Sequence, residues 1–288
     1  MKWRGRRGSA NIEDRRRSGG RRGGGMRRAG GVGGLGAVAI IVVGMLLGVD
    51  TSFLLGSGSA TNDVSYQTQP NQVDDAAEEF VSVGLADTEE VWTDIFARQL
   101  NRRYVHPKMV LFARRTTSTC GAASAASGPF YCPPDKRAYL DTSFFATLEQ
   151  QLGAGGDFAR AYVIAHEVAH HVQNELGILP EVNRLRGQSS EREANQLSVR
   201  LELQADCLSG VWTRHAQARF GLLERGDIEE ALNAAARIGD DALQKRSQGF
   251  VVPDSFTHGS SEQRVRWFEM GLKSGDLQSY DTFSAQRL

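Results

Sequence analysis

The sequence of 288 residues has no net charge, only three cysteines and only one long hydrophobic run. Three cysteines are too few for a four-cysteine zinc site. A single hydrophobic run allows one membrane anchor at most, and the remaining length suits one domain of ordinary size or two small ones. The zero net charge is an average over two parts of opposite sign.

The first part is basic. Residues 1–28 carry eleven Lys and Arg against two acidic residues, a balance of +9, which leaves residues 29–288 at −9. The stretch is rich in Arg and Gly and has almost no apolar residues, so we expect it to be disordered. Such a segment could bind nucleic acid through its charge. The hydrophobic run that follows it favours a different role.

Residues 32–49 are uncharged for eighteen positions, just long enough to span a bilayer. The Lys and Arg excess before this run predicts a cytoplasmic N-terminus and an exported body, in the periplasm or outside the cell. Small residues at 57–60 leave a cleaved signal peptide as the alternative, and that would also export the body. The predicted organisation is a basic disordered tail (1–28), a transmembrane anchor (29–55), a flexible linker (56–76) and a globular domain (77–288).

Two features of the globular part concern its local structure. Residues 87–90, Asp-Thr-Glu-Glu, predict the start of a helix, and the apolar residues that follow recur at helical spacing. Residues 109–112 and 137–141 predict strands. We expect residues 137–141 to be the edge of a sheet, to which the backbone of a peptide substrate could add as a further strand.

The cysteines fit an exported domain. Cys120 and Cys132 are separated by eleven residues in a loop rich in Gly, Ala and Ser. In an oxidising compartment this arrangement predicts a disulfide. Cys207 lies within a predicted helix and is expected to be buried and free.

The strongest chemical signal is His166-Glu167-Val168-Ala169-His170. Residues four apart lie on the same face of a helix, so both imidazoles can reach one zinc ion. Glu167 is turned about 100° from His166 around the helix. It can therefore reach a water on the metal and act as general base. The alternative is an amphipathic helix with ordinary histidines, but this helix is otherwise apolar, and unpartnered histidines would be costly there.

A catalytic zinc needs a third protein ligand. A helix from about 190 to 220 carries Glu202 among apolar neighbours, with Asp206 one turn later. We expect Glu202 to be the third ligand and Asp206 to accept the outer ring N–H of a metal-bound histidine. Other candidates have simpler explanations, as surface, core or capping residues: His106, His171, Glu193 and His215.

His258 lies in the loop Thr257-His258-Gly259 before a predicted helix. It could donate a hydrogen bond to the oxyanion that forms during peptide hydrolysis. Alternatively, it only anchors the loop.

Together these motifs resemble the bacterial neutral zinc metallopeptidases, from about residue 75 to the end. The resemblance rests on His166-Glu-x-x-His170, Glu202-x-x-x-Asp206 and the stretch from Thr257 to Arg264. It implies a mostly helical α+β zincin fold of the glutamate-ligand type, with a small sheet and one Zn²⁺ per chain.

The sequence therefore predicts a membrane-anchored zinc endopeptidase that hydrolyses peptide bonds with a zinc-activated water and Glu167 as base. The rival hypothesis is a catalytically silent, zinc-stabilised scaffold of the cell envelope. The intact Glu167 argues against the rival, because a structural zinc site needs no adjacent base. The position of the basic tail beside the hydrophobic run argues against a nucleic-acid partner.

Overall fold

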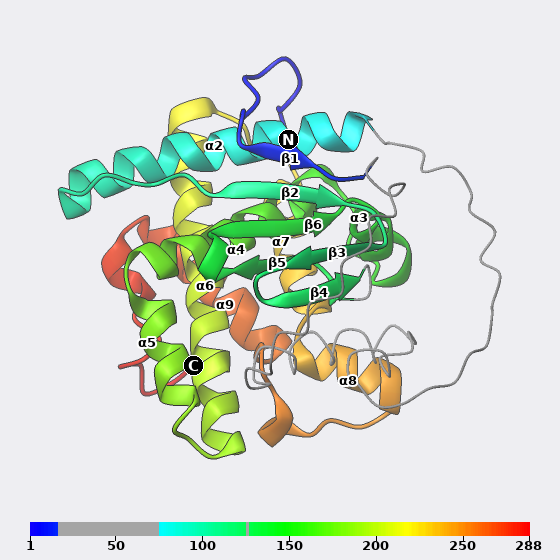
Figure 1. Ribbon diagram of the computed structural model, residues 1–288, viewed down its shortest axis with the longest axis vertical. Helices are drawn as coiled ribbons and strands as arrows, with labels where there is room; N and C mark the ends of the chain where they lie inside the picture. The colour runs from blue at the N-terminus through cyan, green and yellow to red at the C-terminus, as the bar shows by residue number, and fades with distance from the viewer. Residues whose placement is uncertain (17–74, 125–126) are drawn as a thin grey trace, which may run out of the picture.

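The computed structural model describes residues 1–16, 75–124 and 127–288 (Figure 1). The strands are β1 (Ile12–Asp14), β2 (Lys108–Phe112), β3 (Arg115–Ser118), β4 (Gly121–Ser124), β5 (Phe130–Cys132) and β6 (Arg137–Asp141). The helices are α2 (Asp75–Leu100), α3 (Phe144–Ala146), α4 (Asp157–Glu175), α5 (Ile178–Arg186), α6 (Glu191–Phe220), α7 (Asp227–Arg237), α8 (Asp240–Gln248) and α9 (Ser261–Ser274). Short helical turns lie at Pro133–Asp135, Thr147–Gln151, Pro253–Ser255 and Leu277–Tyr280. The predicted mostly helical α+β class is confirmed.

The main sheet has the strand order β1-β2-β6-β5. β1, β2 and β6 run parallel, whereas β5 is antiparallel to β6. The prediction that residues 137–141 form the sheet edge is therefore wrong, because β6 pairs on both sides. The edges of the sheet are β1 on one side and, next to β6, β5 on the other. β5 is only three residues long and follows a stretch of small residues, so its sequence carries no alternating pattern.

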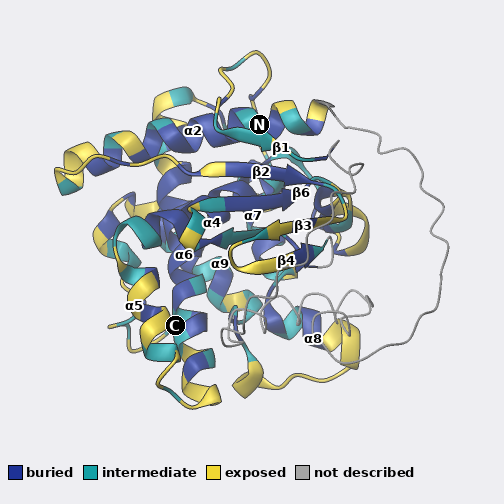
Figure 2. Ribbon diagram, in the orientation of Figure 1, coloured by how far each residue is buried: buried dark blue, intermediate teal, exposed yellow. Residues whose placement is uncertain are grey.

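The metal-site helix α4 is the centre of the core. It contacts β5 and β6 on one side and α2, α6 and α7 on others. Fifteen of its nineteen residues are buried, including Phe158, Tyr162 and Val168. In Figure 2 the inner strands and the middle of α6 are likewise dark blue, while the outer faces of α5 and α8 are exposed. A helix so enclosed holds its polar side chains in fixed positions.

The N-terminus differs from the sequence prediction. Residues 1–28 are expected to be disordered, but residues 1–16 belong to the fold and supply β1. Met1 and Trp3 are buried, and several of the arginines pair with acidic residues of α2. The apolar residues are few, but Met1 and Trp3 pack into the hydrophobic core that other elements form. The remainder of the predicted tail, the predicted anchor and most of the linker lie outside the described residues.

Within the part of the chain that the structure describes, no helix is long and apolar enough to span a bilayer. The hydrophobic run at residues 32–49, on which the predicted anchor rests, falls outside that part.

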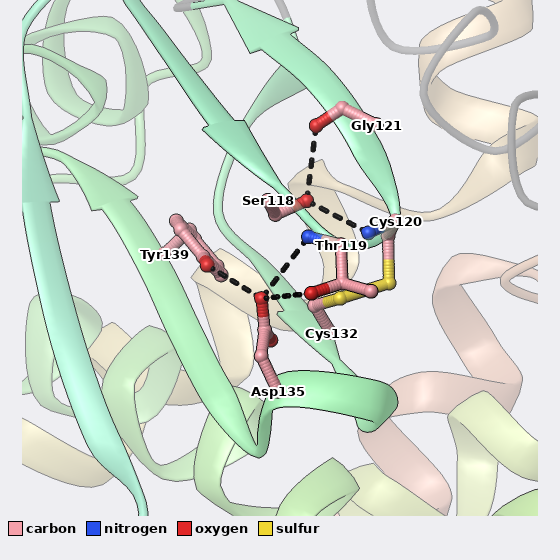
Figure 3. Close-up of a disulfide and its surroundings, with 7 residues drawn as sticks. All are labelled: Ser118, Thr119, Cys120, Gly121, Cys132, Asp135 and Tyr139. Atoms are coloured by element: carbon pink, nitrogen blue, oxygen red, sulfur yellow. Dashed lines mark hydrogen bonds between the residues drawn. A yellow bond between two sulfur atoms is a disulfide. The ribbon is translucent and has the colours of Figure 1, made fainter. Parts of the chain in front are cut away.

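The predicted disulfide is present between Cys120 and Cys132, while Cys207 is buried and free. It joins the turn of the β3–β4 hairpin to the end of β5 (Figure 3). Asp135 strengthens the same junction, since its Oδ2 accepts hydrogen bonds from the backbone and hydroxyl of Thr119 at 3.1 and 3.2 Å and from the Tyr139 hydroxyl at 2.8 Å. The disulfide and Asp135 thus link the hairpin turn to the end of β5 and to β6.

Two glycines bring α9 unusually close to α6. A Cβ atom on Gly271 would stand 1.8 Å from the Cys207 carbonyl oxygen, and one on Gly210 would stand 2.1 Å from the Phe268 oxygen. Only glycine permits this approach. It places the N-terminal half of α9 and the loop before it against the part of α6 that carries Glu202 and Asp206.

Candidate metal centre

Three side chains from two helices converge on one point. His166 and His170 lie one turn apart on α4, and Glu202 faces them from α6. The His166 Nε2 atom is 3.0 Å from Glu202 Oε2, and the His170 Nε2 atom is 3.5 Å from Glu202 Oε1. One donor atom from each residue lies within 4.8 Å of the others, a spacing that suits three ligands of a single ion. The set of two imidazoles and one carboxylate is a typical catalytic zinc set.

Asp206 fixes the orientation of His166. Its Oδ1 accepts from His166 Nδ1 at 3.0 Å, so Nε2 keeps its lone pair toward the ligand cluster. The Tyr162 hydroxyl donates to the same oxygen at 2.5 Å, and Arg264 of α9 donates to both carboxylate oxygens at 2.9 and 3.0 Å. Burial raises the pKa of Asp206, but Arg264 and His166 more than offset this and hold the pKa below its ordinary value. Asp206 therefore stays ionised in a fully buried position.

Gln173 orients the His170 ring, as Asp206 orients that of His166. Its Oε1 lies 2.9 Å from His170 Nδ1, while its Nε2 donates to the Leu201 carbonyl at 2.7 Å and to Gln204 Oε1 at 2.9 Å. Because the Gln173 atom named Nε2 faces two acceptors, it must be the amide nitrogen, and the atom that faces His170 must be the oxygen. His170 Nδ1 must then carry the proton, and Nε2 is left free to bind a metal.

Glu167 lies beside the cluster but not in it. It is buried, and its Oε2 has no hydrogen-bond partner among the described residues. A buried polar atom without a partner needs an explanation, and for a carboxylate beside two histidines a catalytic role is one. Burial raises the pKa of Glu167, and the nearby histidines counteract this only in part. A carboxylate with a raised pKa can both accept and return a proton near neutrality.

His258 lies with Glu202 in the wall of a cavity of about 320 Å³, whose lining also includes Arg186, Ser198 and Thr257. Asp240, the first residue of α8, holds the loop. Its Oδ2 accepts from the backbone N–H groups of residues 257, 258 and 259, and its Oδ1 lies 3.2 Å from His258 Nδ1. Burial lowers the pKa of His258, but Asp240 outweighs this and raises the pKa above its ordinary value. Asp240 thus holds the loop in place, and His258 lines the cavity.

The ligand cluster and Asp206 are thus where sequence spacing places them, whereas several supporting residues have no sequence signal. Tyr162 sits in the apolar face of α4, and Gln173 and Asp240 are near helix ends, so only their contacts reveal them. Arg264 belongs to the stretch on which the family resemblance rests, but its role follows only from its contacts with Asp206. His171, set aside on spacing, bonds instead to the Val105 carbonyl and the Tyr131 hydroxyl.

Comparison with known proteins agrees with this arrangement. A family described as "putative neutral zinc metallopeptidase" matches residues 1–283. The chain is 48% identical over 287 residues to "Uncharacterized protein YpfJ" of Escherichia coli (strain K12), covering 98% of this chain and 99% of that protein. It is 47% identical over 195 residues to "Uncharacterized protein Rv2575" of Mycobacterium tuberculosis (strain ATCC 25618 / H37Rv), covering 64% and 65%. No solved structure matches the chain.

Proposed function

The chain belongs to the putative neutral zinc metallopeptidase family, and from this premise we propose that it is a zinc-dependent endopeptidase. The observation that carries the proposal is the partnerless buried oxygen of Glu167 beside the cluster of His166, His170 and Glu202. A scaffold site would have no use for an unpaired carboxylate at that position.

The three ligands fit zinc in number and in donor type. Zinc bound by them would supply a Lewis acid that polarises a water and the substrate carbonyl. Glu167 accepts a proton from the attacking water, whose oxygen bonds to the carbonyl carbon. Glu167 then returns the proton to the nitrogen as the C–N bond breaks, and the products are a carboxylic acid and an amine, which exchange a proton to become carboxylate and ammonium.

Two further groups have roles in this proposal. His258 faces the cavity and can donate a hydrogen bond to the oxyanion of the tetrahedral species. β5 is one of the two edge strands of the main sheet and contacts α4. An extended peptide could pair with that edge and so pass its backbone along the metal-site helix.

The test compares the full chain with Glu167→Gln. The substitution keeps size and removes the base, so zinc content should stay near one per chain while cleavage of a broad peptide library falls by about 10²–10⁴-fold. Glu191→Gln is the matched control, because Glu191 lines the same cavity outside the ligand cluster and should leave cleavage unchanged. Equal cleavage by wild type and Glu167→Gln would refute the mechanism. Zinc binding without any cleavage by wild type would favour the scaffold hypothesis.

A further inference from the structure

The N-terminal segment, residues 1–16, is integrated with the rest of the fold by its backbone. β1 extends the main sheet, with Ile12 opposite Met109 and Asp14 opposite Leu111 of β2. Two more backbone bonds join Lys2 to the Leu222 carbonyl at 2.8 Å and Ser9 to the Ser82 carbonyl at 3.0 Å. The segment therefore touches the sheet, α2 and the α6–α7 connection.

Trp3 ties the segment to the metal-site helix. It is 6% exposed, and its ring packs edge-on against Phe80 with the ring centres 5.2 Å apart. Its Nε1 donates to Asp157 Oδ2, at the start of α4, at 2.8 Å. Burying a tryptophan while satisfying its N–H in this way is typical of a domain interior rather than of a loosely attached tail.

Basic residues of the segment form ion pairs with acidic residues of α2. Arg6 pairs with Asp87 at 2.7 Å, and Arg7 pairs with Glu90 at 3.1 Å. Ser9 Oγ and Asn11 Nδ2 both donate to Glu89 Oε1, at 2.6 and 2.7 Å. Part of the basic cluster that resembles a cytoplasmic membrane flank is therefore complementary to acidic residues of α2.

These contacts limit how the chain can be arranged at a membrane. We infer that the N-terminal segment and residues 75–288 lie on the same side of any membrane that the chain meets. Hydrogen bonds of about 3 Å cannot form across a hydrocarbon layer about 30 Å thick. The run at residues 32–49 is long enough for one crossing only, and one crossing between Arg16 and Asp75 would separate the two parts. The inference therefore opposes the topology expected from the charge that flanks the run.

The test is thiol accessibility in spheroplasts that express the full chain. Ala10→Cys in the segment and Ala218→Cys on α6 are a matched pair, since both alanines are exposed. The parent chain gives the background, because Cys207 is buried and the other two cysteines are paired. A membrane-impermeant maleimide is applied before and after lysis. We expect the labelled fraction before lysis, relative to that after lysis, to agree within about twofold for the two variants. Labelling of one position before lysis and of the other only afterwards would overturn the inference.

A second measurement tests the docking itself on the purified full chain. Trp3→Ala should lower the melting temperature by roughly 5–10 °C, because it empties a buried site. Lys2→Ala, which keeps the backbone bond and removes an exposed side chain, should leave it unchanged. An unchanged melting temperature for Trp3→Ala would remove the basis of the inference. Neither measurement depends on peptidase activity, so failure here and failure of the proposed function are distinguishable.

Discussion

Gln173 Oε1 lies 2.9 Å from His170 Nδ1, and both side chains come from the same helix three residues apart. The contact looks local, yet it depends on α6. The Gln173 amide is oriented by the Leu201 carbonyl and Gln204. One metal-ligand candidate is therefore positioned by the packing of two helices rather than by helical spacing alone.

Replacing Gln173 tests this positioning. Gln173→Leu removes the acceptor for His170 Nδ1–H, so zinc affinity should fall by about 10–100-fold. Competition with a chromophoric chelator measures it. Gln204→Leu is the comparison: it removes one of the two acceptors that orient the Gln173 amide and leaves the Leu201 carbonyl, so its effect should be smaller. Equal affinities for Gln173→Leu and wild type would show that the contact does not orient His170.

Glu202 should be essential for retaining zinc. Glu202→Ala leaves two histidines and should lose zinc during dialysis against a mild chelator, with the metal content read by atomic emission. Glu191→Ala, in the same cavity wall and on the same helix, should keep the wild-type content. Retention of zinc by Glu202→Ala would exclude Glu202 as the third ligand.

The close approach of α9 to α6 predicts a large effect at Gly271. Its replacement by Ala would place a Cβ against the Cys207 backbone, which has no room to move. We expect a loss of about 1–3 kcal/mol in the free energy of unfolding, measured in urea. At Gly187 the nearest atom to an added Cβ is 3.5 Å away, so Gly187→Ala should be close to neutral. If the two variants are equally stable, the helices can separate without penalty.

Asp87 should make stability depend on pH. Burial raises the pKa of Asp87 from 3.8 to about 7, even though Arg6 lies 2.7 Å away and acts in the opposite direction. The folded chain thus holds this proton more tightly than the unfolded chain. The resulting stabilisation is complete below about pH 4 and is lost as the pH rises through about 7.

Asp87→Asn cannot lose a proton and should lack this dependence. We expect the free energy of unfolding of wild type, minus that of Asp87→Asn, to decrease between pH 4 and pH 7 and then to level off. Urea unfolding at four pH values measures it. A difference that stays constant over the range would show that Asp87 titrates alike in the folded and unfolded chains.

The sequence by itself determined the local features. His166 and His170 are neighbours because any α-helix places residues four apart on one face. The capping boxes at Ser190–Glu193 and Ser260–Gln263 also follow from short-range hydrogen bonds, and the structure contains both. The start of α2 was not predicted correctly. The pattern at residues 87–90 indicates a helix start, but α2 begins at Asp75 and the pattern lies inside it. Buried contacts with the N-terminal segment stabilise those acidic residues in mid-helix.

Only the tertiary structure decided which distant residues meet. Arg264 reaches Asp206 because two glycines bring α9 against α6. β6 is an inner strand because β2 and β5 pair with its two sides. The N-terminal segment gave no sequence signal for order. Its own apolar residues are too few to form a core, and three of its arginines, Arg6, Arg7 and Arg16, pair with acidic residues more than sixty positions away. Such contacts depend on the folded arrangement of other elements, and periodicity within a short window cannot encode them.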